Sequence, residues 1–218
     1  MIKLLVLIIA DDSNSLYIKL QELWKYQMDK IQMSYIDYYF LKCDPTLDEE
    51  IKIVGNTFYV KLEESIFYGI TYKTLKAIEY FSQNYDYILR TNLSSFYRFD
   101  KLYDILELAP RNNYYAGIHG GDFVSGCGFI ISKDIASNIT KNIDKVWDPN
   151  IRYDDVCFGK YIFTNFPTSF HHIPRYDFVN QPSDFVIPEE YPHFRIKYYY
   201  DRDKNDIYTR QKLMTYFL

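Results

Sequence analysis

The sequence predicts an α/β fold, a single-domain sandwich of helices around a mixed central sheet. Three observations predict it. Hydrophobic residues make up 48% of the 218 residues, which is ample for a core, and no low-complexity linker divides the chain. An apolar run, Ile2–Ala10, is typical of a fully buried parallel strand. After it, segments with strand-like and helix-like patterns alternate along the chain.

We interpret the apolar run Ile2–Ala10 as the first strand of the sheet and not as a targeting signal. It is too short to span a bilayer, and it lacks the basic start and small-residue cleavage site of a signal peptide. Asp11 and Asp12 follow it at once. From Ser15 to about Lys30 apolar residues recur at the spacing of an amphipathic helix. We therefore expect a buried strand that leads directly into a helix.

The remaining elements follow from the same two periodicities. Ile51–Val60 contains a Gly55-Asn56 turn and predicts two short paired strands. In chain order, the other predicted elements are a strand at Tyr35–Cys43, a helix at Thr71–Ser82, a strand at Tyr85–Leu89, a helix at Asp100–Leu108, strands at Tyr114–Ile118 and Gly128–Ser132, and helices at Asp134–Asn142 and Asp154–Phe163. The proline-rich stretch 164–192 is expected to form an irregular wall or lid beside the binding site. A Rossmann glycine fingerprint and a P-loop are absent from the sequence.

Charge and cysteine content narrow the function classes. The net charge is −4 and no basic stripe stands out, so we expect no nucleic-acid partner. The three cysteines lie far apart, which argues against a disulfide framework or a zinc cluster. No segment is long and apolar enough to predict a membrane span. A soluble protein of the reducing cytoplasm is the expectation, which would be the host cytoplasm if the chain is viral.

Polar residues follow the strand Tyr85–Leu89, beginning at Arg90 and ending at Ser95. In open α/β sheets, ligands bind at the carboxyl edge, where such residues would lie. The alternative is a plain Asn/Ser turn between two structural elements.

Three further polar clusters lie at predicted element ends. Asp11 and Asp12 would suit a ribose or a base, or they would cap the helix that follows. The segment His119–Gly128 holds four glycines, which would let the backbone approach a ligand or would simply form a tight connection. Asp154 and Asp155 adjoin apolar residues, so one of them would serve as a general base, or both would cap a helix.

These clusters occur in one order that resembles a known family. The matching segments are Glu64-Ser65 with Thr71-x-Lys73-Thr74, then Tyr85–Thr91, Phe123–Asp134 and Asp154–Gly159. The series resembles the β-1,3-galactosyltransferase and Fringe group of GT-A glycosyltransferases. It is most similar to the small soluble versions encoded by large DNA viruses and some bacteria. The similarity covers roughly residues 60 to 165, and its specificity lies in the ordered set rather than in one motif.

The resemblance implies a fold, an activity and partners. The fold would be one GT-A-like (Rossmann-like) domain over residues 1–218, with a donor half at 1–100 and an acceptor half with a basic tail at 101–218. The activity would be inverting transfer from a nucleotide-diphosphate sugar, expected to be a UDP-sugar, to a hydroxyl of a glycan or glycoprotein. A catalytically inactive sugar- or nucleotide-binding module is the alternative.

The family's metal-binding D-x-D motif falls on Asn92-Leu93-Ser94, which departs from the pattern. Mn²⁺ and Mg²⁺ favour carboxylates, so neutral Asn92 and Ser94 should bind either metal much more weakly. Asp86 or Asp122 would supply a carboxylate from nearby, or cationic side chains would replace the metal. No organic cofactor is expected.

The resemblance also implies roles for single residues. The general base maps to Asp155, with Asp154 as the second choice. If the tail is extended, His193, Arg195 and Lys197 lie on one face and reach the diphosphate; a solvated edge strand is the alternative. The other expected donor-binding residues are Asp11, Asp12, Arg90, Thr91, Asn92 and Ser94, and those of the active-site loop are Asp122, Ser125, Gly126 and Gly128.

Overall fold

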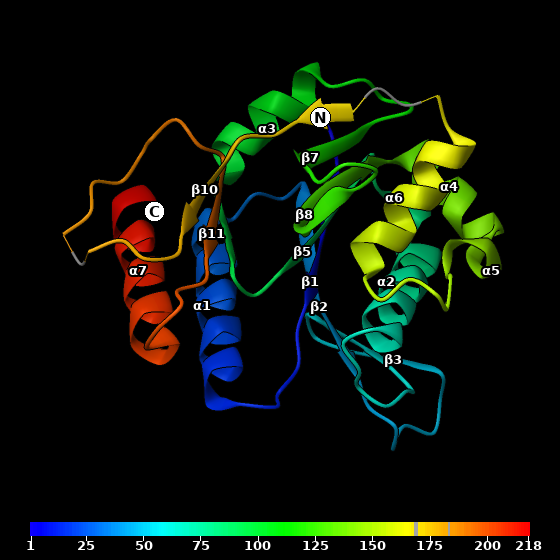
Figure 1. Cartoon of the computed structure of the whole chain (residues 1–218), viewed down its shortest axis with the longest axis horizontal. Coiled ribbons are helices and arrows are strands. Elements are labelled where there is room, and N and C mark those ends of the chain that lie inside the picture. The colour runs from blue at the N-terminus through cyan, green and yellow to red at the C-terminus, as the bar shows by residue number, and fades with distance from the viewer. Residues whose placement is uncertain (168–169, 183) are drawn as a thin grey trace.

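The chain is described by a computed structural model that covers residues 1–167, 170–182 and 184–218. Its centre is an eight-stranded mixed sheet (Figure 1). In spatial order the strands are β3 (Ile51–Val54), β4 (Thr57–Val60), β2 (Ile36–Cys43), β1 (Leu4–Ile9), β5 (Tyr87–Asn92), β8 (Val124–Ser132), β7 (Tyr115–His119) and β9 (Phe170–His172). The mixed α/β fold predicted from the sequence is confirmed.

Parallel pairing brings the ends of three strands to one edge of this sheet. Strand β1 lies parallel to both β2 and β5, and its last residue, Ile9, is level with Leu41 and with Asn92. The segments that follow these strands therefore begin side by side. Strand β8 runs antiparallel to β5, so its Gly128 lies opposite Thr91 near the same edge.

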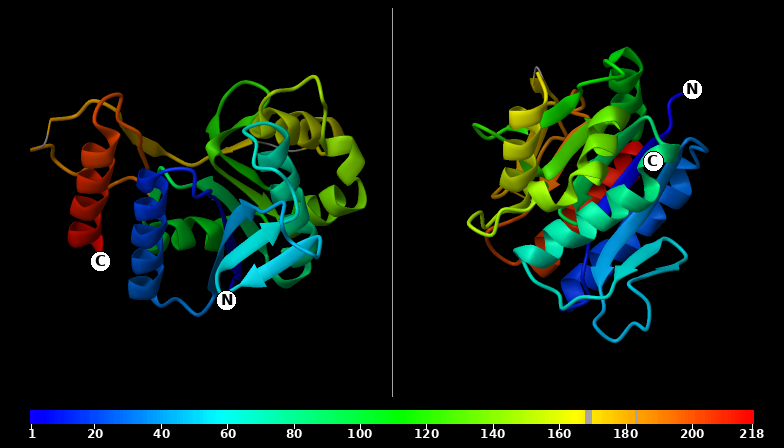
Figure 2. Two further views of the ribbon diagram at one scale, coloured as in Figure 1. Left: turned by 90° about the horizontal axis from the view of Figure 1, so that it is seen from below. Right: turned by 90° about the vertical axis from the view of Figure 1, so that its right-hand side faces the viewer.

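Helices cover both faces of the sheet (Figure 2). On one face α1 (Ser15–Ile31) and α3 (Phe99–Leu108) bury residues such as Trp24 and Leu102. On the other face α2 (Tyr68–Phe81), α4 (Lys133–Lys141) and α6 (Asp154–Asn165) bury residues such as Ile78, Ile135 and Phe158. The short α5 (Ile143–Val146) precedes α6, and a 3₁₀ turn, η1 (Ser82–Asn84), precedes β5. On both faces of the sheet, the apolar residues that these helices bury recur at the helical spacing seen in the sequence.

A second, three-stranded sheet lies beside the first (Figure 1). It consists of β10 (Arg175–Phe178), β11 (His193–Ile196) and β6 (Ser95–Tyr97). Helix α7 (Arg202–Phe217) packs on this sheet and against α1. Its core is largely aromatic, with Phe96, Phe178 and Phe194 in contact with Leu213 and Met214 of α7.

Several expectations for these segments are wrong. Strand β5 does not end at Leu89 but continues through Asn92, because β1 and β8 pair with it on both sides. Likewise β8 begins at Val124, so Gly126 and Gly128 lie within a strand rather than a loop. Strand β11 is the central strand of its sheet, which excludes the solvated edge strand. The N-cap of α1 is Asn14, not the aspartate pair before it.

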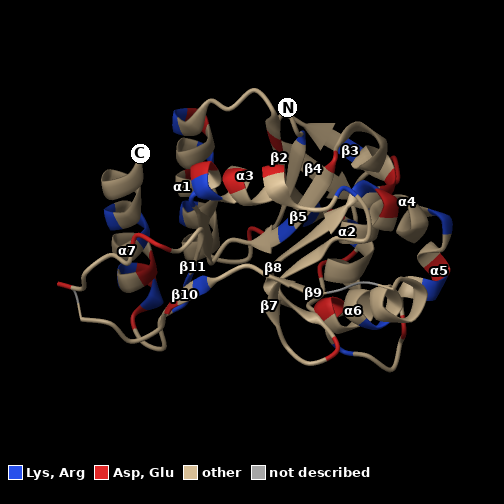
Figure 3. Cartoon of the chain, turned by 90° about the horizontal axis from the view of Figure 1, so that it is seen from above, with Lys and Arg blue, Asp and Glu red and all other residues tan. Residues whose placement is uncertain are grey.

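The tail of the chain is more regular than predicted. Arg202 and Lys204, in the basic tail after β11, belong to the long helix α7, which the apolar pattern did not predict. The stretch 164–192 contains β9 and β10, while Thr168, Ser169 and Ser183 lie outside the described residues. Charged residues of both signs lie on the helices and loops, whereas β7 and β8 carry none (Figure 3). Within the described residues, no helix combines the length and apolar character needed to cross a bilayer.

Candidate active site

Arg90 is a buried cation in the middle of the main sheet. Its side chain is on the α6 side of β5, and the residue is only 3% exposed. Nη2 donates to the Asp154 carboxylate, and Nη1 donates to the Gly126 carbonyl. Burial raises the pKa of Asp154, although the Arg90 charge works in the opposite direction. The pair joins the first residue of α6 to β5 and β8.

Asp155, the next residue, is in a different environment. Its Oδ2 accepts a hydrogen bond from the Gly126 N–H at 2.7 Å, and the residue is partly exposed. A Cβ at Gly126 would lie 3.0 Å from this oxygen and 2.9 Å from Arg90 Nη1, so a larger residue would push both groups away. Asp155 is thus a fixed, reachable carboxylate, whereas its neighbour Asp154 is committed to the arginine.

The turn Asn92–Ser94 connects β5 to β6 at the carboxyl edge. Asn92 Oδ1 accepts from the Ser94 N–H at 3.1 Å, and Asn92 Nδ2 lies 3.5 Å from the Gly126 carbonyl. The Ser94 carbonyl accepts from the Ile196 N–H at 2.6 Å. Arg202 of α7 approaches Ser94 Oγ at 3.4 Å. The turn is therefore enclosed by β8 on one side and by β11 and α7 on the other.

Asp11 and Asp12 lie at the same edge, after β1. Asp11 accepts from the Ser13 N–H at 2.8 Å. Asp12 forms an ion pair with Lys42 at 2.7 Å and accepts from Gln21. Partial burial works to raise the pKa of Asp12, but the bonds from Lys42 and Gln21 outweigh it and leave the pKa below its ordinary value. Neither aspartate caps α1; Asp11 closes a turn with Ser13, and Asp12 pairs with Lys42 while its side chain stays 57% exposed.

Lys73 is a buried residue of this edge whose role the sequence did not predict. It comes from α2, and its Nζ contacts the Ala10 carbonyl at 3.1 Å and Glu64 at 2.7 Å. Glu64 also accepts from the Cys43 N–H. The lysine thereby ties the ends of β1 and β2 to α2. The only sequence signal was its place in the ordered motif series.

His193 comes from β11 of the second sheet and is neutral. The imidazole stacks on Tyr97 at 4.2 Å and lies 3.1 Å from Ser95 Oγ. Burial, with Arg175 and Arg195 nearby, holds the pKa of His193 well below its usual range. His193 is thus a buried neutral group that links β11 to β6.

The basic residues expected beside His193 differ in their surroundings. Arg195 lies 3.3 Å from Asp177, while Lys197 is exposed beyond the end of β11. Arg175 was not predicted; it pairs with Asp177 and donates to Ser125 Oγ of β8 at 3.2 Å, which bridges the two sheets. Ser125, its partner in the other sheet, lies 50 residues away in the sequence, so no local pattern could have indicated this bridge.

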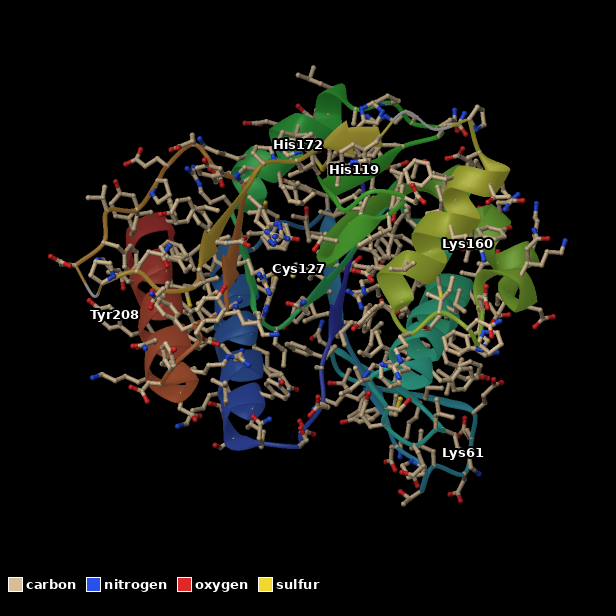
Figure 4. The ribbon with its side chains drawn as sticks, viewed as in Figure 1. Lys61, His119, Cys127, Lys160, His172 and Tyr208 are labelled. Atoms are coloured by element: carbon tan, nitrogen blue, oxygen red, sulfur yellow. The ribbon has the colours of Figure 1, made fainter. Side chains whose placement is uncertain are left out.

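Strand β8 meets the second sheet along its glycine-rich start. The Cys127 carbonyl accepts from Thr91 Oγ1 and from Ser95 Oγ, each at 2.7 Å. Figure 4 shows Cys127 between β8 and the second sheet. Gly128 has Tyr97 against its Cα, so the close approach served by this glycine is made by a protein side chain. Asp122 is exposed in the preceding turn.

The residues at the Asn92–Ser94 turn do not fit a divalent metal ion. The Asn92 amide oxygen already accepts a backbone N–H, and Ser94 offers only a neutral hydroxyl. Within residues 1–167, 170–182 and 184–218, no group of three or more His, Cys, Asp or Glu is placed to hold a metal. Arg202, a cation, is directed at the same turn.

A separate hollow of about 780 Å³ lies between α1 and α7 and is lined by residues that include Leu23, Tyr26 and Met214. None of the polar residues described above lines it. The candidate active site is therefore the group of polar side chains at the sheet edge, not this hollow.

Comparisons with known proteins bear on the fold. No protein-family model matches the chain, and no curated protein matches it in sequence. Among solved structures, the chain is similar to a glycosyltransferase involved in the glycosylation of the major capsid of PBCV-1. The TM-score is 0.53 at 10% identity, and the match covers 98% of this chain and 99% of that one. The fold of this chain is therefore that of a glycosyltransferase.

Proposed function

We propose that this chain is an inverting glycosyltransferase, with a UDP-sugar as donor and a hydroxyl of a glycan or glycoprotein as acceptor. The observation that carries the proposal is the Asp155 carboxylate. It is partly exposed and held by the Gly126 N–H, beside the edge where β1 and β5 end. In open α/β sheets, ligands bind at the carboxyl ends of the strands. The full-length similarity to one glycosyltransferase structure supports the assignment.

Asp155 acts as the general base. It takes the proton of the acceptor hydroxyl, and the oxygen forms a bond to C1 of the sugar. The bond from C1 to the diphosphate breaks on the opposite face, and the nucleoside diphosphate leaves with the electron pair. Asp154 does not perform this step, because it is buried against Arg90. That pair instead orients α6 and therefore Asp155.

In this proposal Asp11 and Asp12 bind the nucleoside and the Asn92–Ser94 turn faces the diphosphate; the support is that both follow parallel strands ending at one edge of the sheet. Carboxylates accept hydrogen bonds from ribose hydroxyls. The transferred sugar would then lie between this turn and Asp155, next to the Ser125–Gly128 part of β8.

The test compares two neighbouring variants. Asp155→Asn should reduce transfer by at least about a hundredfold while UDP affinity is unchanged, since general-base catalysis contributes on that scale. Asp154→Asn should mainly lower thermal stability. Turnover and calorimetric UDP binding are measured on both proteins. Full turnover by Asp155→Asn would remove Asp155 from the role of base.

A catalytically inactive sugar- or nucleotide-binding module is the second candidate. The departure at Asn92 and Ser94 from the family's metal-binding pattern favours it. Such a module would bind UDP-sugars without hydrolysing or transferring them, so calorimetry combined with a hydrolysis assay distinguishes the two candidates. Absence of binding to every nucleotide sugar would contradict both.

A further inference from the structure

Helix α7 directs two arginines at the Asn92–Ser94 turn and carries an aspartate between them. Arg202, Asp206 and Arg210 are spaced four residues apart and therefore lie along one face of the helix. Arg202 approaches Ser94 Oγ at 3.4 Å through Nη2. The same side chain pairs with Asp206 through Nε at 2.9 Å and Nη2 at 2.7 Å, which leaves Nη1 for another acceptor.

Arg210 holds the turn from beneath. Its Nη1 donates to the Leu93 carbonyl at 3.2 Å and to the Ser95 carbonyl at 2.8 Å. Its Nη2 donates to Gln27 at 3.0 Å, and the guanidinium lies 4.6 Å from the Trp24 ring centroid. The residue is 0% exposed. Burial lowers the pKa of Arg210 to about 9, so it is still charged at neutral pH.

Among the residues that the structure describes, one positive charge at this turn has no counter-ion. Asp206 neutralises Arg202, but every partner of Arg210 that the structure describes is a neutral carbonyl, amide or ring. An isolated buried charge is destabilising, and the carbonyl dipoles and the Trp24 ring offset this only in part. An anion arriving at the turn would benefit from this charge and, in the first turn of α7, from the helix dipole.

We propose that α7 supplies at the Asn92–Ser94 turn the positive charge that a divalent metal supplies in other enzymes. Arg202 contacts the donor diphosphate through Nη1, and Arg210 positions the turn and adds its field from below. The inference rests on the proposed function. As the bond from C1 to the diphosphate breaks, negative charge grows on the leaving group, and these cations stabilise it.

This assignment differs from the expectation based on the sequence. The sequence pointed to His193, Arg195 and Lys197, but His193 is buried and neutral and Arg195 already lies beside Asp177. Arg202 and Arg210 are the basic residues that contact the turn itself. They stand there in the place of the missing carboxylates.

The experiment measures binding of UDP and of uridine to the full chain by calorimetry. Arg202→Gln should weaken UDP about tenfold to a hundredfold, the scale of a charge-assisted hydrogen bond, and should change uridine less than twofold. Arg202→Lys should recover part of the loss. Lys204→Gln, the same charge change on the exposed side of α7, should bind both ligands as wild type does. Saturating EDTA should leave wild-type UDP binding intact.

Arg210→Lys and Arg210→Met separate charge from turn geometry. If folded, the Met variant should lose affinity for UDP more than for uridine, and the Lys variant should lose less. Equal UDP affinity of wild type and Arg202→Gln would overturn this inference and leave the proposed function standing. Loss of UDP binding in EDTA would overturn it as well, because a metal would then be required. Failure of wild type to bind UDP at all would overturn the proposed function and this inference together.

Discussion

Gly128 of β8 lies where Tyr97 and His193 of the second sheet pack closely against the main sheet. A Cβ there would overlap Tyr97 Oη and lie 3.0 Å from His193 Cε1. Gly128→Ala should therefore destabilise the protein by about 1–3 kcal/mol, the usual cost of overpacking. Denaturant titration measures it.

A second substitution tests whether that overlap is the cause. Tyr97→Phe removes the oxygen that the new methyl group would meet. In a double-mutant cycle, adding Tyr97→Phe to Gly128→Ala should recover a large part of the loss, because the two sites are in contact. Additive effects of the two changes would place the strain elsewhere.

His193 should make the fold sensitive to acid. Its pKa in the folded protein is well below the ordinary 6.5. As the pH falls through 6.5, the unfolded chain therefore takes up a proton that the folded protein does not, and stability is lost. His193→Gln keeps a hydrogen-bonding group next to Ser95 and should flatten the loss of stability between pH 7.5 and pH 5.5.

Thermal melts across this pH range measure the effect. The control is His172→Gln, since His172 is exposed at the end of β9 (Figure 4). It should keep the wild-type slope. An unchanged slope in His193→Gln would mean that other groups cause the acid sensitivity.

At the scale of elements, the Arg90–Asp154 pair fixes α6 to the sheet. Arg90→Met leaves a buried carboxylate without its partner and should cost about 3–5 kcal/mol. The deficit should shrink as the pH is lowered. Burial raises the Asp154 pKa and the Arg90 charge lowers it, so without the arginine the buried carboxyl takes up its proton at a higher pH and becomes neutral. Denaturant unfolding at two pH values measures both effects.

The same helix offers a matched control. Lys160 forms an ion pair with Asp148, but its side chain is 63% exposed. Lys160→Met should therefore change stability little. An equal loss of stability in Arg90→Met and Lys160→Met would show that the buried pair contributes no more than an exposed pair. Asp154→Leu combined with Arg90→Met should restore stability, since an apolar pair of similar size can replace a buried ion pair.

The sequence predicted those elements whose signal is local. The buried run of β1, the Gly55-Asn56 turn between β3 and β4, and the apolar stripes of α1 and α4 each appear in a short window. It missed β6 and β10, which are short and gain their stability from partners distant in the sequence. It also missed α7, because much of the buried face of that helix is polar, with Asp206, Thr209 and Arg210.

The candidate site was predictable in position more than in detail. Four polar clusters pointed to one sheet edge, and the structure brings Arg90, Asn92, Gly126 and Asp155 into a connected group there. The different environments of Asp154 and Asp155 could not be predicted from two adjacent aspartates in the sequence. They depend on the direction in which α6 begins relative to β5, which long-range packing sets.

At the scale of the whole molecule, Gln27 ties α1, which packs on the main sheet, to the second sheet and α7. From α1, its Nε2 donates to the Tyr97 carbonyl of β6 at 2.8 Å, and its Oε1 accepts from Arg210 of α7. Because this residue is fully buried, the second sheet and α7 should not unfold apart from the main sheet. A single cooperative transition is expected.

Trp24 provides the probe for that prediction, since it lies in the core under α1. In a Trp147→Phe variant, the fluorescence of Trp24 and the far-UV circular dichroism should change at the same urea concentration. Separate midpoints for the two signals would indicate that the sheets unfold independently.

The Cys127 carbonyl accepts hydrogen bonds from the hydroxyls of both Thr91 and Ser95. These bonds affect which substitutions each of the three positions tolerates. The acceptor is a main-chain atom that any residue supplies, whereas the two donors are side chains that only serine or threonine can readily replace. In a saturation library selected for folded protein, position 127 should therefore tolerate many residue types, while positions 91 and 95 keep a hydroxyl. Selection would therefore constrain position 127 of β8 very little, although its carbonyl joins the two sheets. The constraint would appear instead at positions 91 and 95, which supply the hydroxyls.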